Sequence, residues 1–226
     1  MRIAIAVILA TAAFAAAQAQ TPSIEDAAPG KPVDVAALVR ALKSGGYILF
    51  FRHTKTDWGD RTKEARFREA GTLDVENCHT QRNLSDEGRE EARRQAELFK
   101  RLGFPMGEVR SSRYCRAREH AQAFTPTFVY SEPLTPFRTK EKGRVLRQML
   151  AMPPAAGTNT LMFAHGGILW EATDFDSVES ETFVFRPGAP AKLVAAVRIE
   201  DWARLERGTG TCCAPRDFWR GTPPAE

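Results

Sequence analysis

The chain has 226 residues, of which 43% are hydrophobic and 27% are charged, and its formal net charge is +4. A chain of this length can bury one sizeable core, so we expect a single folded domain. The positive charge is small and dispersed. It favours an anionic substrate and argues against nucleic acid as a partner.

Residues 1–19 resemble a secretory signal peptide. Arg2 precedes an apolar stretch from Ile3 to Ala17, and Ala17-Gln18-Ala19 fits the small-x-small pattern of a cleavage site. The apolar stretch is rich in alanine and too short to form a stable membrane span. We therefore expect a periplasmic or secreted protein.

The remaining chain divides by composition into three parts. Residues 20–33 are rich in Pro, Gly and Ala and are predicted to be a flexible lead-in, whereas residues 34–206 are predicted to fold. Residues 207–226 contain several glycines and prolines without apolar periodicity, which predicts an irregular tail.

Apolar periodicity predicts a helix over 35–43 and a strand over 47–52 that is buried on both faces. The polar stretch 54–83 that follows is predicted to be a long loop that shapes or covers a substrate site. Ser85 is a good N-cap for the next helix, which Gly103 ends.

Strands and helices continue to alternate along the rest of the chain. The predicted elements are a strand over 108–111, a helix from Arg116 to Pro126, a helix over 138–152, a strand over 160–164, a helical turn over 167–173 and a hairpin of strands 182–186 and 192–199. This alternation indicates an α/β sandwich with a mainly parallel sheet.

Basic side chains follow two of the predicted strands. The strand over 47–52 ends at Arg52 and His53, and the strand over 160–164 ends at His165, which precedes Gly166-Gly167. The carboxyl ends of strands are where open α/β sheets bind ligands. An imidazole beside a guanidinium at such an edge could hold an oxyanion and attack it. The alternative is that these groups simply meet solvent or pack in the core.

Three ordered motifs resemble the histidine phosphatase superfamily, which includes the phosphoglycerate-mutase-like enzymes. They are Arg52-His53-Thr54, the segment from Ser111 to Ala121 that contains Arg116, and the strand that ends at His165. The linking segment Cys78-His79-Thr80-Gln81-Arg82-Asn83-Leu84-Ser85-Asp86-Glu87-Gly88 is also similar to the Leu-Ser/Thr-x-x-Gly helix start common in the family. The resemblance covers roughly residues 34–202 and favours an exported bacterial branch. It implies a three-layer α/β/α sandwich.

The resemblance also implies a role for each matching residue. His53 would be the phosphorylated nucleophile, Arg52 and Arg116 would clamp the phosphate through planar, charged forks, and His165 would donate a hydrogen bond to the phosphoryl group. No metal or other cofactor is expected, because these four basic side chains would supply the charge. Export favours an envelope or extracellular phosphomonoester as the substrate. The alternative is a non-catalytic phosphate- or glycan-binding module of the same fold.

The proton donor for the leaving group is open. In many relatives a carboxylate between the second arginine motif and the final histidine has this role, and Glu132 occupies that interval. Asp57, four residues after His53, is the competing candidate. The chain also has Arg113 and His120 where the family commonly has Pro and Thr, which could add positive charge near the phosphate site.

Four cysteines in an exported chain favour disulfides. Cys78 and Cys115 each lie beside a site motif, and we predict that they pair and brace the pocket. Cys212 and Cys213 are adjacent in the sequence. Vicinal disulfides are rare, so we expect cross-pairing or free thiols there.

Overall fold

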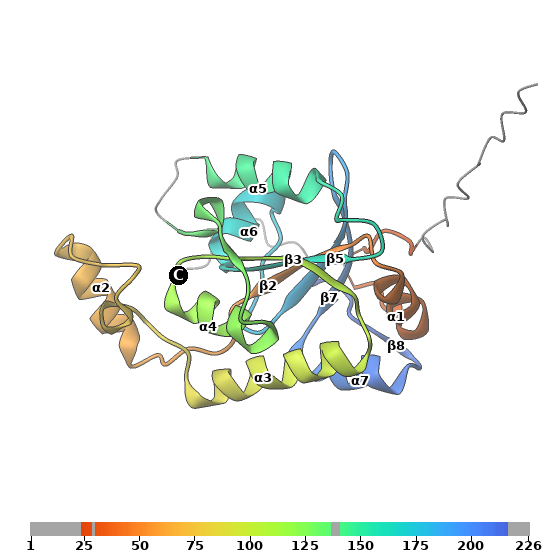
Figure 1. The fold of residues 1–226 in the computed structure, drawn as a ribbon, viewed down its shortest axis with the longest axis horizontal. Coiled ribbons are helices and arrows are strands. Elements are labelled where there is room, and N and C mark those ends of the chain that lie inside the picture. Colours follow the sequence, from red (N-terminus) through yellow and green to blue (C-terminus); the bar gives the residue numbers. More distant parts are fainter. Residues whose placement is uncertain (1–23, 29, 137–140, 217–226) are drawn as a thin grey trace, which may run out of the picture.

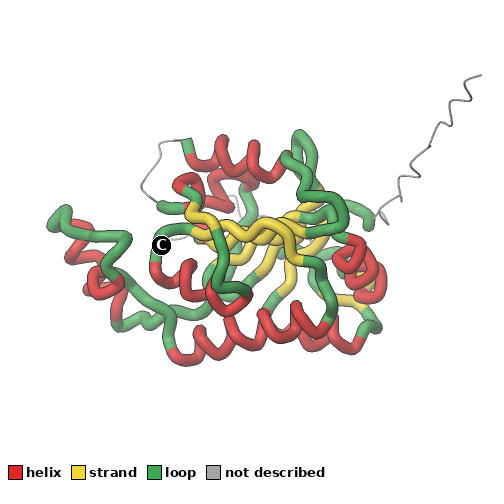
Figure 2. Tube along the Cα trace, in the orientation of Figure 1, coloured by secondary structure: helices red, strands yellow, loops and turns green. Residues whose placement is uncertain are grey.

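The computed structural model describes residues 24–28, 30–136 and 141–216. The expected signal peptide lies outside these residues. Helices cover both faces of a central sheet, which confirms the predicted three-layer α/β/α sandwich (Figures 1 and 2).

The central sheet has six strands in the order β4-β3-β5-β2-β6-β7. Neighbours from β4 to β2 run parallel, and β6 and β7 extend the sheet antiparallel. The larger part of the sheet, from β4 to β2, is therefore parallel, which agrees with the mainly parallel sheet that the sequence predicts. The strands are β2 (Ile48–Arg52), β3 (Met106–Ser111), β4 (Val129–Tyr130), β5 (Asn159–Ala164), β6 (Thr182–Arg186) and β7 (Lys192–Val197).

Strand β2 shows why both faces of the sheet need helices. Leu49 and Phe51 belong to one hydrophobic cluster, while Ile48 and Phe50 belong to the other. The alternation follows from the period of two residues in a strand. The first cluster packs against α1 (Val35–Ser44), α3 (Asp86–Arg101), α4 (Cys115–Phe124) and α7 (Trp202–Arg207), and the second against α5 (Lys142–Ala151) and α6 (Gly166–Thr173).

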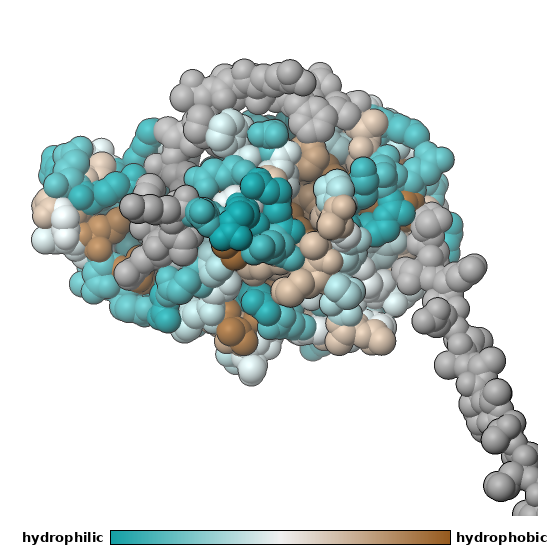
Figure 3. Space-filling view, turned by 90° about the horizontal axis from the view of Figure 1, so that it is seen from above, coloured by the Kyte–Doolittle hydropathy of each residue, from teal (hydrophilic) through white to brown (hydrophobic). Residues whose placement is uncertain are grey.

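The helix caps follow the sequence closely. The Ser85 side chain accepts a hydrogen bond from the Gly88 amide at the start of α3, as predicted for an N-cap. The described residues also form three short 3-10 turns: η1 (Cys78–Thr80), η2 (Glu132–Leu134) and η3 (Ile199–Asp201). Figure 3 views the molecule from the side of α5 and α6, where hydrophilic residues cover most of the described surface.

The polar stretch 54–83 is not a continuous loop, because it contains helix α2 (Asp60–Glu69). Neither hydrophobic cluster of the described residues includes a residue of α2. A helix without an apolar stripe leaves no periodic pattern in the sequence, which explains why it escapes prediction.

Part of the expected irregular tail is ordered. Strand β8 (Thr211–Cys212) pairs antiparallel with β1 (Val33–Asp34), so the described ends of the lead-in and the tail lie together. Cys212 and Cys213 are both buried in the first hydrophobic cluster.

Cys212 and Cys213 form a disulfide with each other, so the expectation of cross-pairing or free thiols is wrong. Their Cα atoms are 3.7 Å apart, and Cys213 has a positive φ of 65°. Cys78 and Cys115 are bonded to each other, so the cysteine partner that remains for Cys212 is Cys213.

Within residues 24–28, 30–136 and 141–216, no helix has both the length and the apolar character needed to cross a membrane.

Gly88 allows α3 to begin close to the backbone that follows β2. A Cβ at position 88 would lie 1.9 Å from the Lys55 carbonyl oxygen, so the backbone would have to move. We predict that Gly88→Ala lowers the free energy of unfolding by about 2 kcal/mol or more. Gly59→Ala is the control, because its Cβ would meet the side chain of Asp57 rather than backbone, with Oδ1 at 3.1 Å and Cγ at 3.9 Å. Guanidinium unfolding measures both, and equal stability of the two variants would contradict the prediction.

Candidate functional site

Three neighbouring parallel strands end at the same edge of the sheet and deliver the predicted site residues there. Arg52 ends β2 opposite Ala164 of β5, and His53 and His165 follow these two residues. Ser112 follows the end of β3, the other neighbour of β5. The rings of His53 and His165 lie with their centroids 5.2 Å apart. Both imidazoles are nearly inaccessible, at 2% and 1% exposure.

A backbone hydrogen bond fixes the tautomer of His53. Nδ1 of His53 lies 3.0 Å from the Thr54 carbonyl oxygen, which can only accept, so Nδ1 carries the proton and Nε2 carries the lone pair. Burial, and then the charges of Arg116 and Arg52, hold the pKa of His53 well below 6.5. The ring is therefore neutral at pH 7, the form in which an imidazole is nucleophilic.

Arg116 presents an open, buried fork. Its Nη1 donates to Glu64 Oε2 at 2.9 Å and to the Arg82 carbonyl oxygen at 3.3 Å. Its Nε and Nη2, which form the side-on edge of the guanidinium, are buried and have no hydrogen-bond partner among the described residues. Two such parallel donors match the oxygens of a phosphate or a carboxylate, and burying them unpaired is costly. The arrangement is suited to an anion.

Arg52 is held against the chain that follows His165. Its Nη1 donates to the Ser177 carbonyl oxygen at 2.5 Å. A Cβ at Gly166 would lie 2.7 Å from this same Nη1, so the glycine makes room for the guanidinium. The group that approaches Gly166 closely in the structure is therefore Arg52.

Arg82 is a third arginine of the site that the sequence did not single out. It is 2% exposed, and its charge lowers the pKa of both His53 and His165. Burial and the neighbouring charge of Arg116 lower the pKa of Arg82 itself, because like charges are crowded here. A bound anion would offset that crowding. The one sequence clue was its place two residues before Leu84 in the helix-start motif.

Arg82 lies against an exposed aromatic ring. Trp58 is 54% exposed, and its ring centroid lies 4.7 Å from the guanidinium carbon of Arg82. On the other side of Arg82, Glu179 Oε1 lies 3.9 Å from Nη1. Glu179 also accepts hydrogen bonds from the backbone and the hydroxyl of Thr56. These contacts set the direction of the Arg82 side chain.

His165 is tied to the strand beside its own. Its Nε2 lies 3.0 Å from Ser112 Oγ, and Nδ1 is buried with no partner among the described residues. Burial, then the charges of Arg116, His53 and Arg52, hold the pKa of His165 well below 6.5. The structure thus brings Arg52, His53, Arg116 and His165 together.

The two candidate proton donors lie apart from this group. Glu132 accepts from Arg113 Nε, and its side chain is 48% exposed. The segment that contains Glu132 is nevertheless linked to His165 through Ser112. Thr135 Oγ1 of this segment lies 3.5 Å from Ser112 Oγ, which in turn lies 3.0 Å from His165 Nε2. Asp57 is exposed and accepts from the Gly59 amide at 2.8 Å, which shapes the start of α2.

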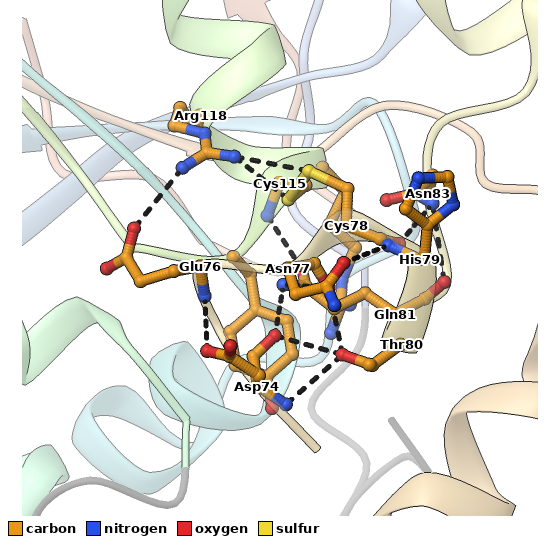
Figure 4. The surroundings of a disulfide bond; sticks show 12 residues. Asp74, Glu76, Asn77, Cys78, His79, Thr80, Gln81, Asn83, Cys115 and Arg118 are labelled. Carbon is orange, nitrogen blue, oxygen red and sulfur yellow. Dashed lines mark hydrogen bonds and ion pairs between the residues drawn. A yellow bond between two sulfur atoms is a disulfide. The ribbon is translucent and has the colours of Figure 1, made fainter. Parts of the chain in front are cut away.

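The predicted disulfide between Cys78 and Cys115 is present, with Cα atoms 5.7 Å apart. It joins η1 to the first residue of α4, directly before Arg116 (Figure 4). Arg118 donates to both sulfurs, and Gln81 Oε1 accepts from the Cys115 amide at 2.8 Å. The bridge therefore braces the segment that carries Arg82 against the helix that carries Arg116.

The two departures from the family pattern do not add free positive charge to the site. His120 is buried, and its ring makes edge contacts with Phe51 and Phe163. Arg113 pairs with Glu76 and Glu132 at the surface.

Comparison with known proteins agrees with this arrangement. Residues 48–134, which carry Arg52, His53 and Arg116, match the family model of the histidine phosphatase superfamily (branch 1). This segment belongs to the histidine phosphatase superfamily. Membership supports a phosphatase activity. No curated protein sequence matches the chain.

Two solved structures are similar to this chain. The protein histidine phosphatase SixA complexed with tungstate has 12% sequence identity and a TM-score of 0.50, covering 69% of this chain and 98% of its own. Phosphoserine phosphatase from Entamoeba histolytica, in complex with 3-phosphoglyceric acid, has 14% identity and a TM-score of 0.46, covering 66% of this chain and 95% of its own.

The burial of His120 predicts sensitivity to acid. Burial lowers its pKa from 6.5 to about 3. Between these values the unfolded chain binds a proton that the folded protein does not, so stability falls as the pH decreases. Each pH unit costs at most about 1.4 kcal/mol for one group. In His120→Gln the amide can still donate to Gln95, which accepts from His120 Nε2 at 2.8 Å.

We therefore expect urea unfolding of His120→Gln to depend less steeply on pH than that of the wild type between pH 6 and 4. Superposable slopes would contradict the prediction.

Proposed function

We propose that the protein is an exported phosphatase that hydrolyses phosphomonoesters through a phosphohistidine intermediate on His53. The substrate is a small phosphorylated anion, and an envelope compound suits an exported enzyme. No metal takes part, because the arginines supply the positive charge that phosphoryl transfer requires.

In the first step Nε2 of His53 attacks phosphorus in line with the leaving oxygen, which departs with the bonding electrons and takes up a proton. Arg52, Arg82 and Arg116 stabilise the charge on the equatorial phosphoryl oxygens, and His165 donates a hydrogen bond to the same group. Water then attacks phosphorus, the bond to Nε2 breaks, and inorganic phosphate leaves.

The observation that carries the proposal is the state of His53. Its Nδ1 is occupied by the Thr54 carbonyl, its ring is kept neutral by burial and by three arginines, and the open fork of Arg116 belongs to the same group. A nucleophile and donors for an oxyanion are the two parts that this chemistry needs.

His53→Ala tests the mechanism against the alternative of a non-catalytic phosphate- or glycan-binding module. We expect the wild-type protein to take up an acid-labile phosphoryl label and to hydrolyse nitrophenyl phosphate. His53→Ala should fold, take up no label and lose turnover. A folded His53→Ala protein with the wild-type rate would refute the mechanism. A wild-type protein that binds phosphate without becoming labelled would favour the binding module.

Glu132 is our proposed proton donor, and its role predicts a dependence on the leaving group. An acid contributes most when the leaving group is poor. We expect Glu132→Ala to slow alkyl phosphates far more than nitrophenyl phosphate, and Asp57→Ala to slow both about equally. A selective loss in Asp57→Ala instead would assign the role to Asp57.

A second candidate function is hydrolysis of phosphoramidates or acyl phosphates, which depart with little help. It is favoured by the positions of Glu132 and Asp57, whose hydrogen-bond partners are Arg113 and the Gly59 amide. Equal effects on alkyl and nitrophenyl phosphates in both variants would support this candidate.

A further inference from the structure

Helix α2 is attached to the domain through an acidic side chain. Of its ten residues, all of which the structure describes, Glu64 is the buried one, at 3% exposure. Figure 1 shows α2 projecting from the body of the molecule. A helix normally buries an apolar stripe, so a lone buried carboxylate is an unusual anchor and calls for a reason.

The Glu64 carboxylate reaches two segments of the phosphate site. Oε2 accepts from Arg116 Nη1 at 2.9 Å and from the Arg82 amide at 2.6 Å. Oε1 accepts from Arg68 Nη2 at 2.7 Å, one turn along the same helix. The carboxylate is therefore held by its own helix and in turn holds Arg116.

The contact with Glu64 fixes the plane and direction of the Arg116 fork. A guanidinium is rigid and planar, so anchoring Nη1 determines where Nε and Nη2 point. The ring of Tyr114, whose centroid is 4.5 Å from the guanidinium carbon, limits tilting of that plane. The remaining edge of the guanidinium carries Nε and Nη2, which are buried and have no hydrogen-bond partner in the part of the chain that the structure describes.

We propose that Glu64 is a positioning residue that aims the Nε and Nη2 donors of Arg116 at the bound phosphoryl group. This inference rests on the proposed function in taking the Arg116 fork as a phosphate site. Glu64 acts through Arg116 and does not touch the reacting atoms. A helix outside the hydrophobic core thereby sets the geometry of the anion site.

The proposal and simple electrostatics predict opposite changes in anion affinity when Glu64 is neutralised. Glu64→Gln removes a negative charge next to the site, and charge alone would make an anion bind more tightly. Loss of positioning would make it bind more weakly, because the amide cannot accept from Arg116, the Arg82 amide and Arg68 together. Partners that orient metal ligands are commonly worth about tenfold or more in affinity, and we expect the same scale for a partner that orients an anion-binding arginine.

The experiment is calorimetric titration of the full chain with tungstate, compared among the wild type, Glu64→Gln and Glu69→Gln. Glu69→Gln is the matched control, because it removes an exposed carboxylate from the same helix. We expect Glu64→Gln to weaken tungstate binding by about tenfold or more, with Glu69→Gln close to the wild type. Unchanged or tighter binding in Glu64→Gln would overturn the proposal, even if its melting temperature fell, since a merely structural role would lower stability alone.

If Glu64→Gln does not fold, Glu64→Asp gives the same test, because it keeps the charge and shortens the reach. Wild-type affinity in Glu64→Asp would then overturn the proposal, and weaker binding would support it. Because tungstate binding needs no turnover, the result is separate from the proposed function. If the wild-type protein binds tungstate but takes up no phosphoryl label on His53, the proposed mechanism is refuted. The tungstate affinities of the Glu64 variants would still decide the role of Glu64.

Discussion

The concentration of buried positive charge at one edge of the sheet is the constraint on which the rest of the site depends. Arg52, Arg82 and Arg116 repel one another in a place that water hardly reaches, and such groups are stable only with partners. The chain supplies a carbonyl for Arg52, a carboxylate for Arg116 and a more distant carboxylate for Arg82. These partners neutralise part of the charge and leave the remainder for an anionic ligand.

The same crowding explains why both imidazoles are neutral. A protonated His53 or His165 would add a further positive charge to a site that already has an excess. Burial and the arginines act in the same direction on both rings. One arrangement therefore keeps both imidazoles neutral and concentrates positive charge beside them.

The fold and the strand-end residues could be predicted from the sequence because they leave local patterns. A buried parallel strand is a short apolar run, and a polar residue directly after it must lie at the carboxyl edge, which placed Arg52, His53 and His165. Arg116 could also be identified from the sequence, because it lies in a motif at the start of a helix.

Arg82 and Glu64 could not be found in the same way. Both lie in or beside a polar stretch where apolar periodicity is absent, and their importance comes from contacts across 34 and 52 residues of sequence. The role of Cys213 was missed for a similar reason. Its partner is its neighbour in the sequence, and its positive φ and its burial in the first hydrophobic cluster leave no local pattern in the sequence.

The pairing of β1 with β8 has a mechanical consequence. The two strands are antiparallel, with Val33 opposite Cys212 and Asp34 opposite Thr211, so the lead-in and the tail lie side by side at this point. Both segments are also tied to an edge strand of the central sheet, because the Ala27 amide donates to the Leu193 carbonyl and the Ala196 amide donates to the Cys213 carbonyl. Tension applied to either segment would therefore load β7 together with the β1–β8 pair, while β2 and β5, which precede His53 and His165, lie further inside the sheet.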